Sequence, residues 1–319
     1  MFFKFLLIVL GFILLIFGAD ILVKSASNIA KKFNISEVLI GLTIVSLGTS
    51  LPELIITLAS STSNQDLIIG NVIGSNICNL LLILGILSLL KPIKLDENNV
   101  KTSFPILILI NVLILVMSFL PLKKLPLVID TKEGIILLII ALIYFAIPII
   151  KHFSNKNDNV NSTDVKEDDY SVIKSLLLII LGGFSLKYGG DFVVDSSINI
   201  ATILNVPTNV IGLTIVALGT SLPELVTSIV AIIKGNHNMA EGNIIGSCII
   251  NFCLILGFGS ILSIIELDSK SIENLIFLLF GTLIIWLYGL SNSKHTLYKY
   301  HGISLLIIFA IYLLRLFVI

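Results

Sequence analysis

Two glutamates are the residues of this sequence best placed to do chemistry. Glu53 and Glu224 each stand within a long apolar stretch, and each ends the same six-residue motif, GTSLPE. A carboxylate in the middle of a membrane span costs about 2.5–3.5 kcal/mol to insert, so such a residue indicates a function by default. A protonated glutamate bonded to a neighbour is the simple alternative. Two copies in one repeated motif favour a binding role instead.

The same motif predicts a broken helix. Pro52 and Pro223 have no N–H group, so the carbonyls of Gly48 and Gly219, four residues earlier, lose their helical partners. Free carbonyls within a membrane are tolerated only where they line a cavity or meet a ligand. Further hydroxyl and backbone oxygens at this level come from Thr49, Ser50, Thr220 and Ser221. Each motif thus predicts one carboxylate and several neutral oxygens at a helix break.

A second repeated motif, GNxIGS, adds hydroxyls and amides. Ser75 and Asn79 are four residues apart, as are Ser247 and Asn251, so each pair is expected on one helix face. If these four residues meet the broken helices, they complete a site of two carboxylates, two amides and several hydroxyl and carbonyl oxygens. Without Cys or His, such a site disfavours zinc and copper and suits Ca²⁺, which takes 6–8 oxygen ligands. The same oxygens could instead hold several Na⁺ ions.

Structural roles compete with this interpretation at several positions. The two serines could bond back within their own helices, and the two asparagines could join helices rather than bind ions. The four-residue glycine spacing in the second motif also permits close helix packing. Asp20 and Asp191 lie near span ends and are expected to be interfacial caps, while Asn71 and Asn243 are expected to be structural.

The elements that must position these residues are membrane helices. Hydrophobic residues make up 56% of the 319 residues, charged residues 13%, and the mean hydropathy is +1.07, far from the composition of a soluble domain. The net charge is zero and offers no basic surface for nucleic acid. Three cysteines in apolar segments form no metal or disulfide pattern, so we expect them to be packing residues. The first apolar run, Phe5 to Ala19, is interpreted as a retained helix, because a related stretch recurs later.

Ten stretches are long enough to cross about 30 Å of hydrocarbon as helices. They cover residues 3–22, 36–60, 68–90, 104–121, 133–150, 172–190, 207–233, 241–264, 273–290 and 302–318. The polar stretch from Lys151 to Tyr170 divides them near the middle and is expected to be a solvated linker.

The two halves of the chain are copies of each other. IGLTIVSLGTSLPEL at 40–54 returns at 211–225 with one change, Ser46 to Ala217, and GNVIGSNICNLLLILG at 70–85 returns at 242–257 as GNIIGSCIINFCLILG. We therefore divide the chain into a first five-helix repeat, 1–150, a linker, 151–171, and a second repeat, 172–319. An odd number of helices per repeat predicts opposite orientations across the membrane.

The charges of the loops give the sidedness. With the N-terminus outside, thirteen lysines fall in inside loops and seven Lys and Arg fall in outside segments. Since basic residues accumulate on the cytoplasmic side, we expect a multi-pass protein of the cell membrane with both termini extracellular and the central linker cytoplasmic.

With its paired GTSLPE and GNxIGSxxxN motifs, the sequence resembles the sodium/calcium exchanger family of the calcium/cation antiporter superfamily, and most of all its compact prokaryotic members. The resemblance implies that Glu53 and Glu224 bind both Ca²⁺ and Na⁺, and that backbone oxygens of Thr49 and Thr220 join them for Ca²⁺. It assigns to Na⁺ a set of hydroxyls and carbonyls from Ser50, Ser75, Ser221, Ser247, Ser46 and Ala217. Asn79 and Asn251 would complete the central site. Some prokaryotic and potassium-dependent relatives carry Asp where this sequence has Asn251, so this departure argues against potassium coupling and leaves two acidic groups.

The resemblance implies antiport by alternating access, with the first spans of each half sliding past the rest. Ca²⁺ and Na⁺ would be substrates, with no cofactor, and the protein is expected to work as a monomer.

The nearest alternative is an H⁺-coupled cation exchanger, in which the glutamates release protons. The neutral oxygens, which Na⁺ needs, argue against it. An intramembrane enzyme is disfavoured because there is no HExxH motif and all four histidines lie in or beside loops. A purely structural membrane protein would not need two intramembrane glutamates.

Overall fold

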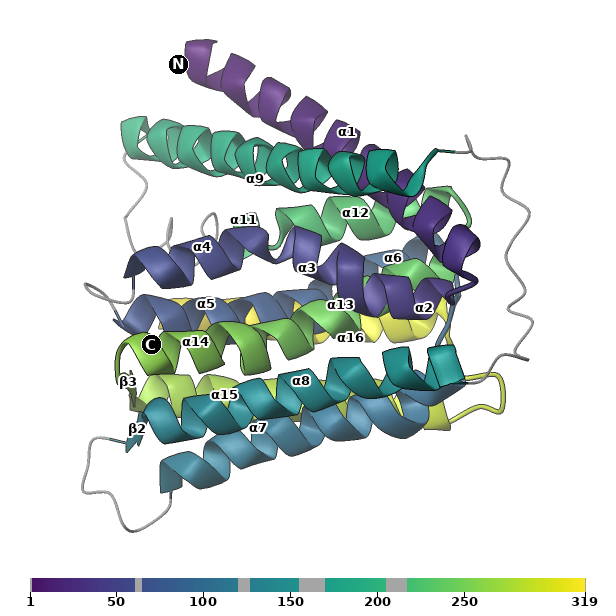
Figure 1. The fold of residues 1–319 in the computed structure, drawn as a ribbon. Coiled ribbons are helices and arrows are strands. Elements are labelled where there is room, and N and C mark those ends of the chain that lie inside the picture. The colour runs from purple at the N-terminus through teal and green to yellow at the C-terminus, as the bar shows by residue number, and fades with distance from the viewer. Residues whose placement is uncertain (1, 61–64, 120–126, 155–169, 205–216, 319) are drawn as a thin grey trace.

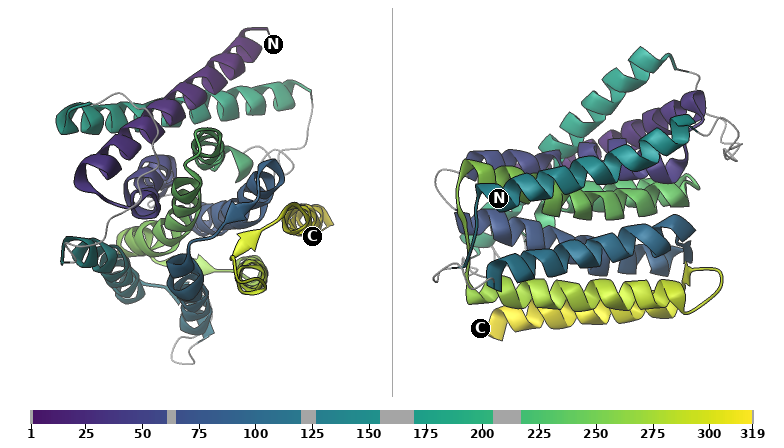
Figure 2. Two further views of the ribbon diagram at one scale, coloured as in Figure 1. Left: turned by 90° about the vertical axis from the view of Figure 1, so that its right-hand side faces the viewer. Right: turned by 60° about the horizontal axis from the view of Figure 1, so that its bottom comes forward.

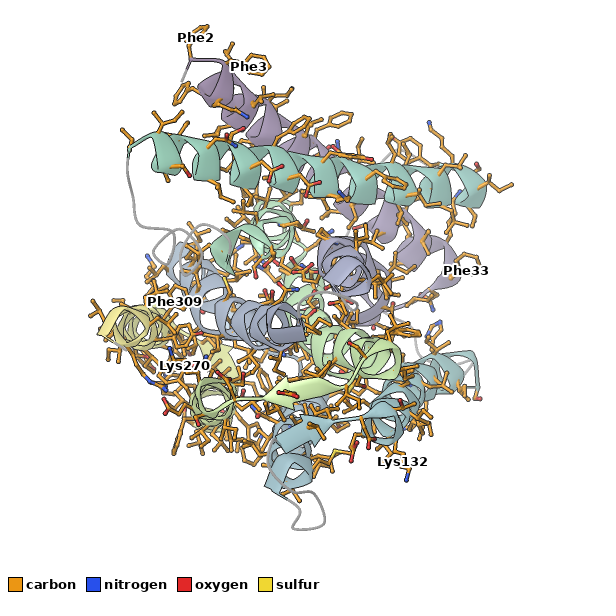
Figure 3. All side chains as sticks on the ribbon, turned by 90° about the vertical axis from the view of Figure 1, so that its left-hand side faces the viewer. Phe2, Phe3, Phe33, Lys132, Lys270 and Phe309 are labelled. Carbon is orange, nitrogen blue, oxygen red and sulfur yellow. The ribbon has the colours of Figure 1, made fainter. Side chains whose placement is uncertain are left out.

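The computed structural model describes residues 2–60, 65–119, 127–154, 170–204 and 217–318, which form a bundle of long helices (Figure 1). Eight helices in these ranges are long and apolar enough to cross a membrane. Their outer faces carry exposed apolar side chains, among them Phe2 and Phe3 (Figure 3). Exposed apolar area of this extent suits a protein whose solvent is lipid.

The elements of the first half, in chain order, are long helices joined by short helical and π-helical segments. They are α1 (Phe2–Phe33), α2 (Glu37–Ile40), η1 (Gly41–Val45), α3 (Ser46–Thr49), α4 (Leu51–Ser60), α5 (Gln65–Ile77), η2 (Cys78–Ile83), α6 (Leu84–Leu90), β1 (Ile93–Lys94), η3 (Asn99–Ser103), α7 (Phe104–Phe119), β2 (Leu127–Ile129) and α8 (Thr131–Ser154).

The second half follows a similar order. Its elements are α9 (Val172–Ile203), α11 (Ala217–Gly219), α12 (Leu222–Ile233), α13 (His237–Ile249), η5 (Ile250–Ile255), α14 (Leu256–Leu262), β3 (Ile265–Leu267), α15 (Ser269–Leu290), β4 (Thr296–Leu297) and α16 (Lys299–Val318).

Eight of the expected spans match long helices, and two do not. The span expected at 36–60 is divided into short helices on either side of Ser50. Of the span expected at 207–233, residues 207–216 lie outside the described residues, and the rest contains the short helix α12. Both interruptions fall within a GTSLPE motif, where proline removes a backbone hydrogen-bond donor.

Several helix ends differ from the expected ends. α1 and α9 each have 32 residues, about 48 Å of helix, so the expected ends at 22 and 190 were too early. Small side chains such as Ser25 and Ala26 lower the local hydropathy, yet they are buried against other helices. α8 continues to Ser154, four residues beyond the expected end of this span at 150.

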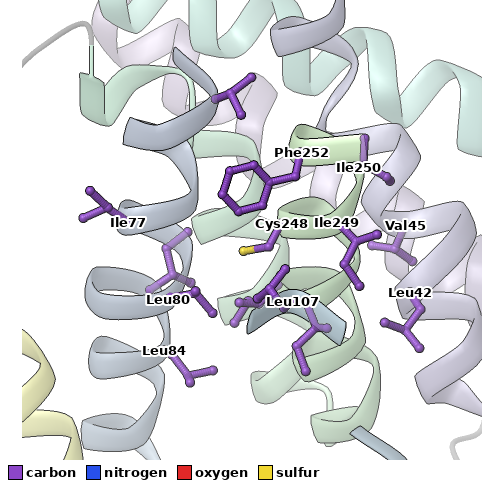
Figure 4. Packing of buried hydrophobic residues seen from close by; sticks show 14 of the residues in the cluster. Leu42, Val45, Ile77, Leu80, Leu84, Leu107, Cys248, Ile249, Ile250 and Phe252 are labelled. Atoms are coloured by element: carbon purple, nitrogen blue, oxygen red, sulfur yellow. The ribbon is translucent and has the colours of Figure 1, made fainter. Parts of the chain in front are cut away.

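The centre of the bundle is formed by two matched helices. The segments Ile68–Leu90 and His237–Leu262 are 78% and 83% buried over their apolar windows, against 22–44% for the other long helices. Each passes from α-helix to π-helix and back, and the two π segments start at corresponding positions of the two copies, Cys78 and Ile250. Phe252 of η5 and Cys248 of α13 belong to the buried core (Figure 4).

Glycines let α13 lie against η1. A Cβ atom added at Gly242 would lie 2.4 Å from the carbonyl oxygen of Val38, and one at Gly246 would lie 2.5 Å from that of Leu42. These distances leave no room for a side chain, so the close approach expected from this motif is confirmed in the second copy.

α1 and α9 form a separate layer across one face of the bundle (Figure 2). They run antiparallel, with Gly11 against Gly189 and Gly18 against Gly182, and each glycine would place a Cβ within 2.9 Å of its partner's carbonyl oxygen. On the opposite face lie α7, α8 and α15 (Figure 1).

Two short antiparallel strand pairs connect the halves. β1 pairs with β4 through Ile93 and Leu297, and β2 pairs with β3 through Val128 and Glu266. No strand was expected from the sequence. Each pair joins one segment from the first half to one from the second.

Candidate cation site

Both glutamates lie just after the helix breaks. Ser50 separates α3 from α4, and Ser221 precedes α12; their backbone ψ angles of 9° and 4° depart from the helical value. Glu53 and Glu224 therefore stand in the first turns of α4 and α12. The positive end of a helix stabilises a carboxylate there, by typically 0.3–1 kcal/mol and more when the site is partly buried. The break was predicted from the sequence, but this favourable placement was not.

The carboxylates are buried and largely without hydrogen bonds. Glu53 is 1% exposed and Glu224 is fully buried. One oxygen of Glu224 lies 3.0 Å from the Ser50 hydroxyl and 3.3 Å from the Ser247 hydroxyl. Its other oxygen and both oxygens of Glu53 have no hydrogen-bond partner among the described residues. Since burying such groups unpartnered is costly, these oxygens are candidate ligands.

The break at Ser50 is joined to the second half by hydroxyl contacts. The Ser50 and Ser247 hydroxyl oxygens are 3.1 Å apart, and Thr49 Oγ1 lies 3.4 Å from Ser247. Thr49 also donates to the amide oxygen of Asn243 at 3.1 Å, while the Asn243 amide nitrogen donates to Ser228 at 3.0 Å. Asn243 therefore holds Thr49 in place through protein contacts, as expected of a structural residue.

Around the second break, fewer matching contacts are found among the described residues. The hydroxyls of Ser75 and Thr220 are 3.3 Å apart, which joins α5 to the break before α12. The Ser221 hydroxyl is buried and has no partner among the described residues. The two copies of the motif thus meet crosswise, each serine of the second motif lying against a hydroxyl of the other half's first motif.

Ser46 and Ala217 differ from the other predicted residues. The Ser46 hydroxyl donates to the carbonyl of Leu42 at 2.6 Å, so its side chain is satisfied within its own helix. Its carbonyl accepts from the Ser50 N–H at 2.9 Å and from the Thr49 hydroxyl at 3.3 Å. Ala217 is the first residue of α11.

Asn79 and Asn251 lie in the two π-helical segments, η2 and η5. Both side chains are fully buried, and neither the amide atoms of Asn79 nor the amide oxygen of Asn251 has a hydrogen-bond partner in the described structure. Single π turns inside α-helices are frequent at functional sites. The sequence motif indicated the two asparagines but not the π winding.

Among the predicted site residues, six buried oxygens have no hydrogen-bond partner in the described structure: two of Glu53, one of Glu224, and one each of Asn79, Asn251 and Ser221. This number and type match the 6–8 oxygen ligands of Ca²⁺. The described residues include no group of three His, Cys, Asp or Glu side chains placed to hold a metal ion. Any cation held here would therefore rely on neutral oxygens beside the carboxylates.

The structure also shows buried polar residues that the sequence analysis did not single out. Glu241 on α13 is 1% exposed and accepts hydrogen bonds from the backbone of Asp96 at 2.9 Å and the amide of Asn99 at 2.9 Å. The sequence did carry a signal for this residue, because position 241 holds an acid where the first copy holds Ile69. Asn76, which the second copy replaces with Cys248, is likewise buried.

The aspartates form ion pairs outside this site. Asp20 on α1 pairs with Lys24 at 2.8 Å and with Lys234, at the end of α12, at 2.7 Å. Asp191 pairs with Lys187 at 2.5 Å. All three cysteines are free and buried, as expected of packing residues.

α1 and α9 cover the two breaks. A Cβ atom added at Gly48 would lie 2.9 Å from Leu22 of α1, and one added at Gly219 would lie 2.1 Å from Val194 of α9. The glycines of the two GTSLPE motifs therefore let the crossing helices lie directly on the broken segments.

Comparison with known proteins places this arrangement in a family. The family model described as sodium/calcium exchanger protein matches residues 3–150 and 174–318. The chain belongs to the sodium/calcium exchanger family. Its membership makes it a transporter of the antiporter type rather than a member of an enzyme family.

Individual proteins resemble the chain over most of its length. It is 33% identical to the sodium/calcium exchanger MaX1 of Methanosarcina acetivorans, over 83% of this chain and 85% of that protein. It is also 33% identical to the inner membrane protein YrbG of Escherichia coli (strain K12), over 82% and 81%. The solved structure of the sodium-calcium exchanger NCX_Mj, soaked with zero Na⁺ and Ca²⁺, matches with a TM-score of 0.80 and 30% identity over 98% of each chain.

Proposed function

We propose that this family member exchanges Na⁺ for Ca²⁺ across a membrane by alternating access. The observation that supports this most is that six buried oxygens of the predicted site residues, three of them on Glu53 and Glu224, have no hydrogen-bond partner in the described structure. Two buried carboxylates carry the charge that one Ca²⁺ neutralises, and the neutral oxygens complete its coordination. The same ligands can serve Na⁺, which needs neutral oxygens as much as charge.

In this proposal the two glutamates bind both ions and set the exchange. Two buried negative charges without a cation are costly, so the protein reorients mainly when Ca²⁺ or Na⁺ occupies the site. Competition for shared ligands then couples the two fluxes. The remaining ligands are the backbone oxygens of Thr49 and Thr220 for Ca²⁺, the hydroxyls of Ser50, Ser75, Ser221 and Ser247 and the carbonyls of Ser46 and Ala217 for Na⁺, and the amides of Asn79 and Asn251.

We further infer ten spans arranged as two inverted five-helix repeats, 1–150 and 172–319. The antiparallel crossing of α1 and α9 supports opposite orientations for the two copies, as does the matched α–π–α winding of the two central helices. The lysine distribution supports extracellular termini and a cytoplasmic linker.

The moving part is the α1/α9 pair. These two helices pack against each other through four glycines and cover both helix breaks. We infer that one chain is sufficient for transport.

An H⁺-coupled exchanger is the second candidate. The observation that favours it is that Glu53 is buried without any hydrogen-bond partner among the described residues, so a proton could replace the cation there. The neighbouring hydroxyls and amides favour Na⁺, because H⁺ transfer does not need them.

The test is uptake of radiolabelled Ca²⁺ into proteoliposomes under outward gradients of Na⁺, K⁺ or H⁺. We expect uptake with the Na⁺ gradient alone, and loss of uptake in Glu53→Gln and Glu224→Gln. Glu241→Gln is the matched control, since it neutralises an equally buried glutamate that is hydrogen-bonded outside the site. Uptake driven by H⁺ would move the protein to the second candidate, and full activity in either site variant would refute the assignment of the site.

A further inference from the structure

Asn76 connects the two central helices in a fully buried position. Its amide nitrogen donates to the backbone carbonyl of Cys248 at 3.3 Å, and its amide oxygen accepts from the amide nitrogen of Asn251 at 3.1 Å. Asn76 and Asn251 are both 0% exposed. The contacts form a short chain from the backbone of α13, through α5, and back to the side chain in η5.

This chain fixes which way each amide points. A backbone carbonyl can only accept, so Asn76 must turn its nitrogen toward Cys248 and its oxygen toward Asn251. That oxygen can also only accept, so Asn251 must turn its nitrogen toward Asn76. The amide oxygen of Asn251 is left over, and it has no hydrogen-bond partner in the described part of the chain. The orientation follows from donor and acceptor chemistry alone.

The corresponding positions of the other half, as far as the structure describes them, hold no such arrangement. Position 248 matches position 76 in the repeat, but it holds cysteine, whose thiol is a weak donor and a weak acceptor. Asn79, which matches Asn251, has no hydrogen-bond partner at either amide atom within the described residues. One asparagine of the proposed site is therefore held in orientation by another amide, whereas its counterpart lies beside the thiol of Cys248, a weaker hydrogen-bonding group.

We propose that Asn76 is a positioning residue that keeps the oxygen of Asn251 directed toward the transported cation. The inference rests on the proposed function, because it takes Asn251 as a ligand. Without Asn76, the amide nitrogen of Asn251 would be free to turn toward the unpartnered carboxylate oxygens of the site and to donate to them. A cation would then have to compete with that hydrogen bond, and apparent affinity falls in proportion to the fraction of binding-competent sites.

The expected effect is on affinity rather than on turnover. A released amide that donates to a carboxylate would leave roughly a tenth of the sites competent, and this factor of ten corresponds to about 1.4 kcal/mol. Asn76→Ala should therefore raise the half-saturating Ca²⁺ concentration about tenfold while the maximal rate of Na⁺-driven uptake changes little. Asn76→Cys, which copies the residue found in the other half, should do the same.

The experiment is a double-mutant cycle on the full-length protein in proteoliposomes, with the half-saturating Ca²⁺ concentration as the readout. If Asn76 acts through Asn251, then Asn76→Ala made in an Asn251→Ala background should change that concentration less than twofold. The same substitution in an Asn79→Ala background should keep its full effect. Contacting residues show this kind of non-additivity, and independent ones do not.

A merely structural role would give a different pattern. Asn111→Leu controls for the loss of a buried asparagine elsewhere, since Asn111 on α7 is 1% exposed and unpartnered in the described structure; it should leave the Ca²⁺ dependence unchanged. Equal effects of Asn76→Ala with and without Asn251, or a fall in maximal rate alone, would overturn the inference. Absence of Na⁺-driven uptake in the wild type would refute the proposed function instead, so the two failures are distinguishable.

Discussion

The crossing of α1 and α9 gives a sharp prediction because two adjacent glycines of α9 have different surroundings. A Cβ atom at Gly189 would lie 2.8 Å from both the carbonyl oxygen of Gly11 and the backbone nitrogen of Leu15. A Cβ atom at Gly190 would lie no closer than 3.9 Å to Pro223 Cγ, which is ordinary contact. Gly189→Ala and Gly190→Ala are therefore a matched pair, with the same chemical change one residue apart on one helix.

The magnitude follows from the distances. The backbone atoms at Gly189 cannot rotate away, so α1 and α9 would have to separate by about 0.6 Å to restore a contact of 3.4 Å. Overpacking of this kind typically costs about 1–3 kcal/mol. Replacing the helical Gly190 should instead stabilise by up to about 1 kcal/mol, because alanine loses less backbone freedom on folding.

The assay is thermal unfolding of the two purified variants in detergent, followed by transport in proteoliposomes. We expect the midpoint of Gly189→Ala to lie below that of Gly190→Ala by on the order of 5 °C. We also expect slower Na⁺-driven Ca²⁺ uptake in Gly189→Ala, because its effect falls within the pair of helices proposed to move together. Equal midpoints for the two variants would refute the close crossing.

Three further predictions follow from contacts outside the crossing. Lys234→Gln breaks the salt bridge to Asp20 and should speed hydrogen exchange at the α12–α13 turn, whereas Lys24→Gln should not. Because the bridge is partly exposed, the free energy of opening this turn should fall by about 0.2–1 kcal/mol. Glu241→Ala should lower the thermal midpoint without shifting the half-saturating Ca²⁺ concentration, because buried amide donors lose their acceptor outside the site. Added Ca²⁺ should raise the thermal midpoint of the wild type, since a ligand that binds only the folded state stabilises it, and this rise should be absent in Glu224→Gln.

Residue chemistry made much of the site predictable. Proline four residues after glycine removes a specific hydrogen bond, so the breaks near Ser50 and Ser221 could be located without coordinates. An exact repeat fixes which residues correspond, so Glu224 follows once Glu53 is recognised. The family also followed from the motifs, and the family model confirmed it. The assignment of individual ligands to Ca²⁺ or Na⁺ stays a prediction.

Other features depend on packing that sequence patterns do not encode. The π winding at Asn79 adds one residue to a turn without any change in hydropathy. The lengths of α1 and α9 were underestimated because buried Ser25 and Ala26 look polar or neutral to a hydropathy window, although they face neighbouring helices. The link from Asn76 to Asn251 joins residues 175 positions apart, and only the fold brings them together.

The strand pairs at the ends of the bundle bear on how the chain assembles. β1 and β3 occupy matching places in the two copies, yet neither pairs within its own copy; each takes its partner from the other one. A single copy would leave its strand edges open, so we expect the two copies to fold as one cooperative unit rather than as independent domains. If the gene is cut between α8 and α9, the two fragments should therefore be unstable when made separately. Made together, they should reassemble through these strand pairs.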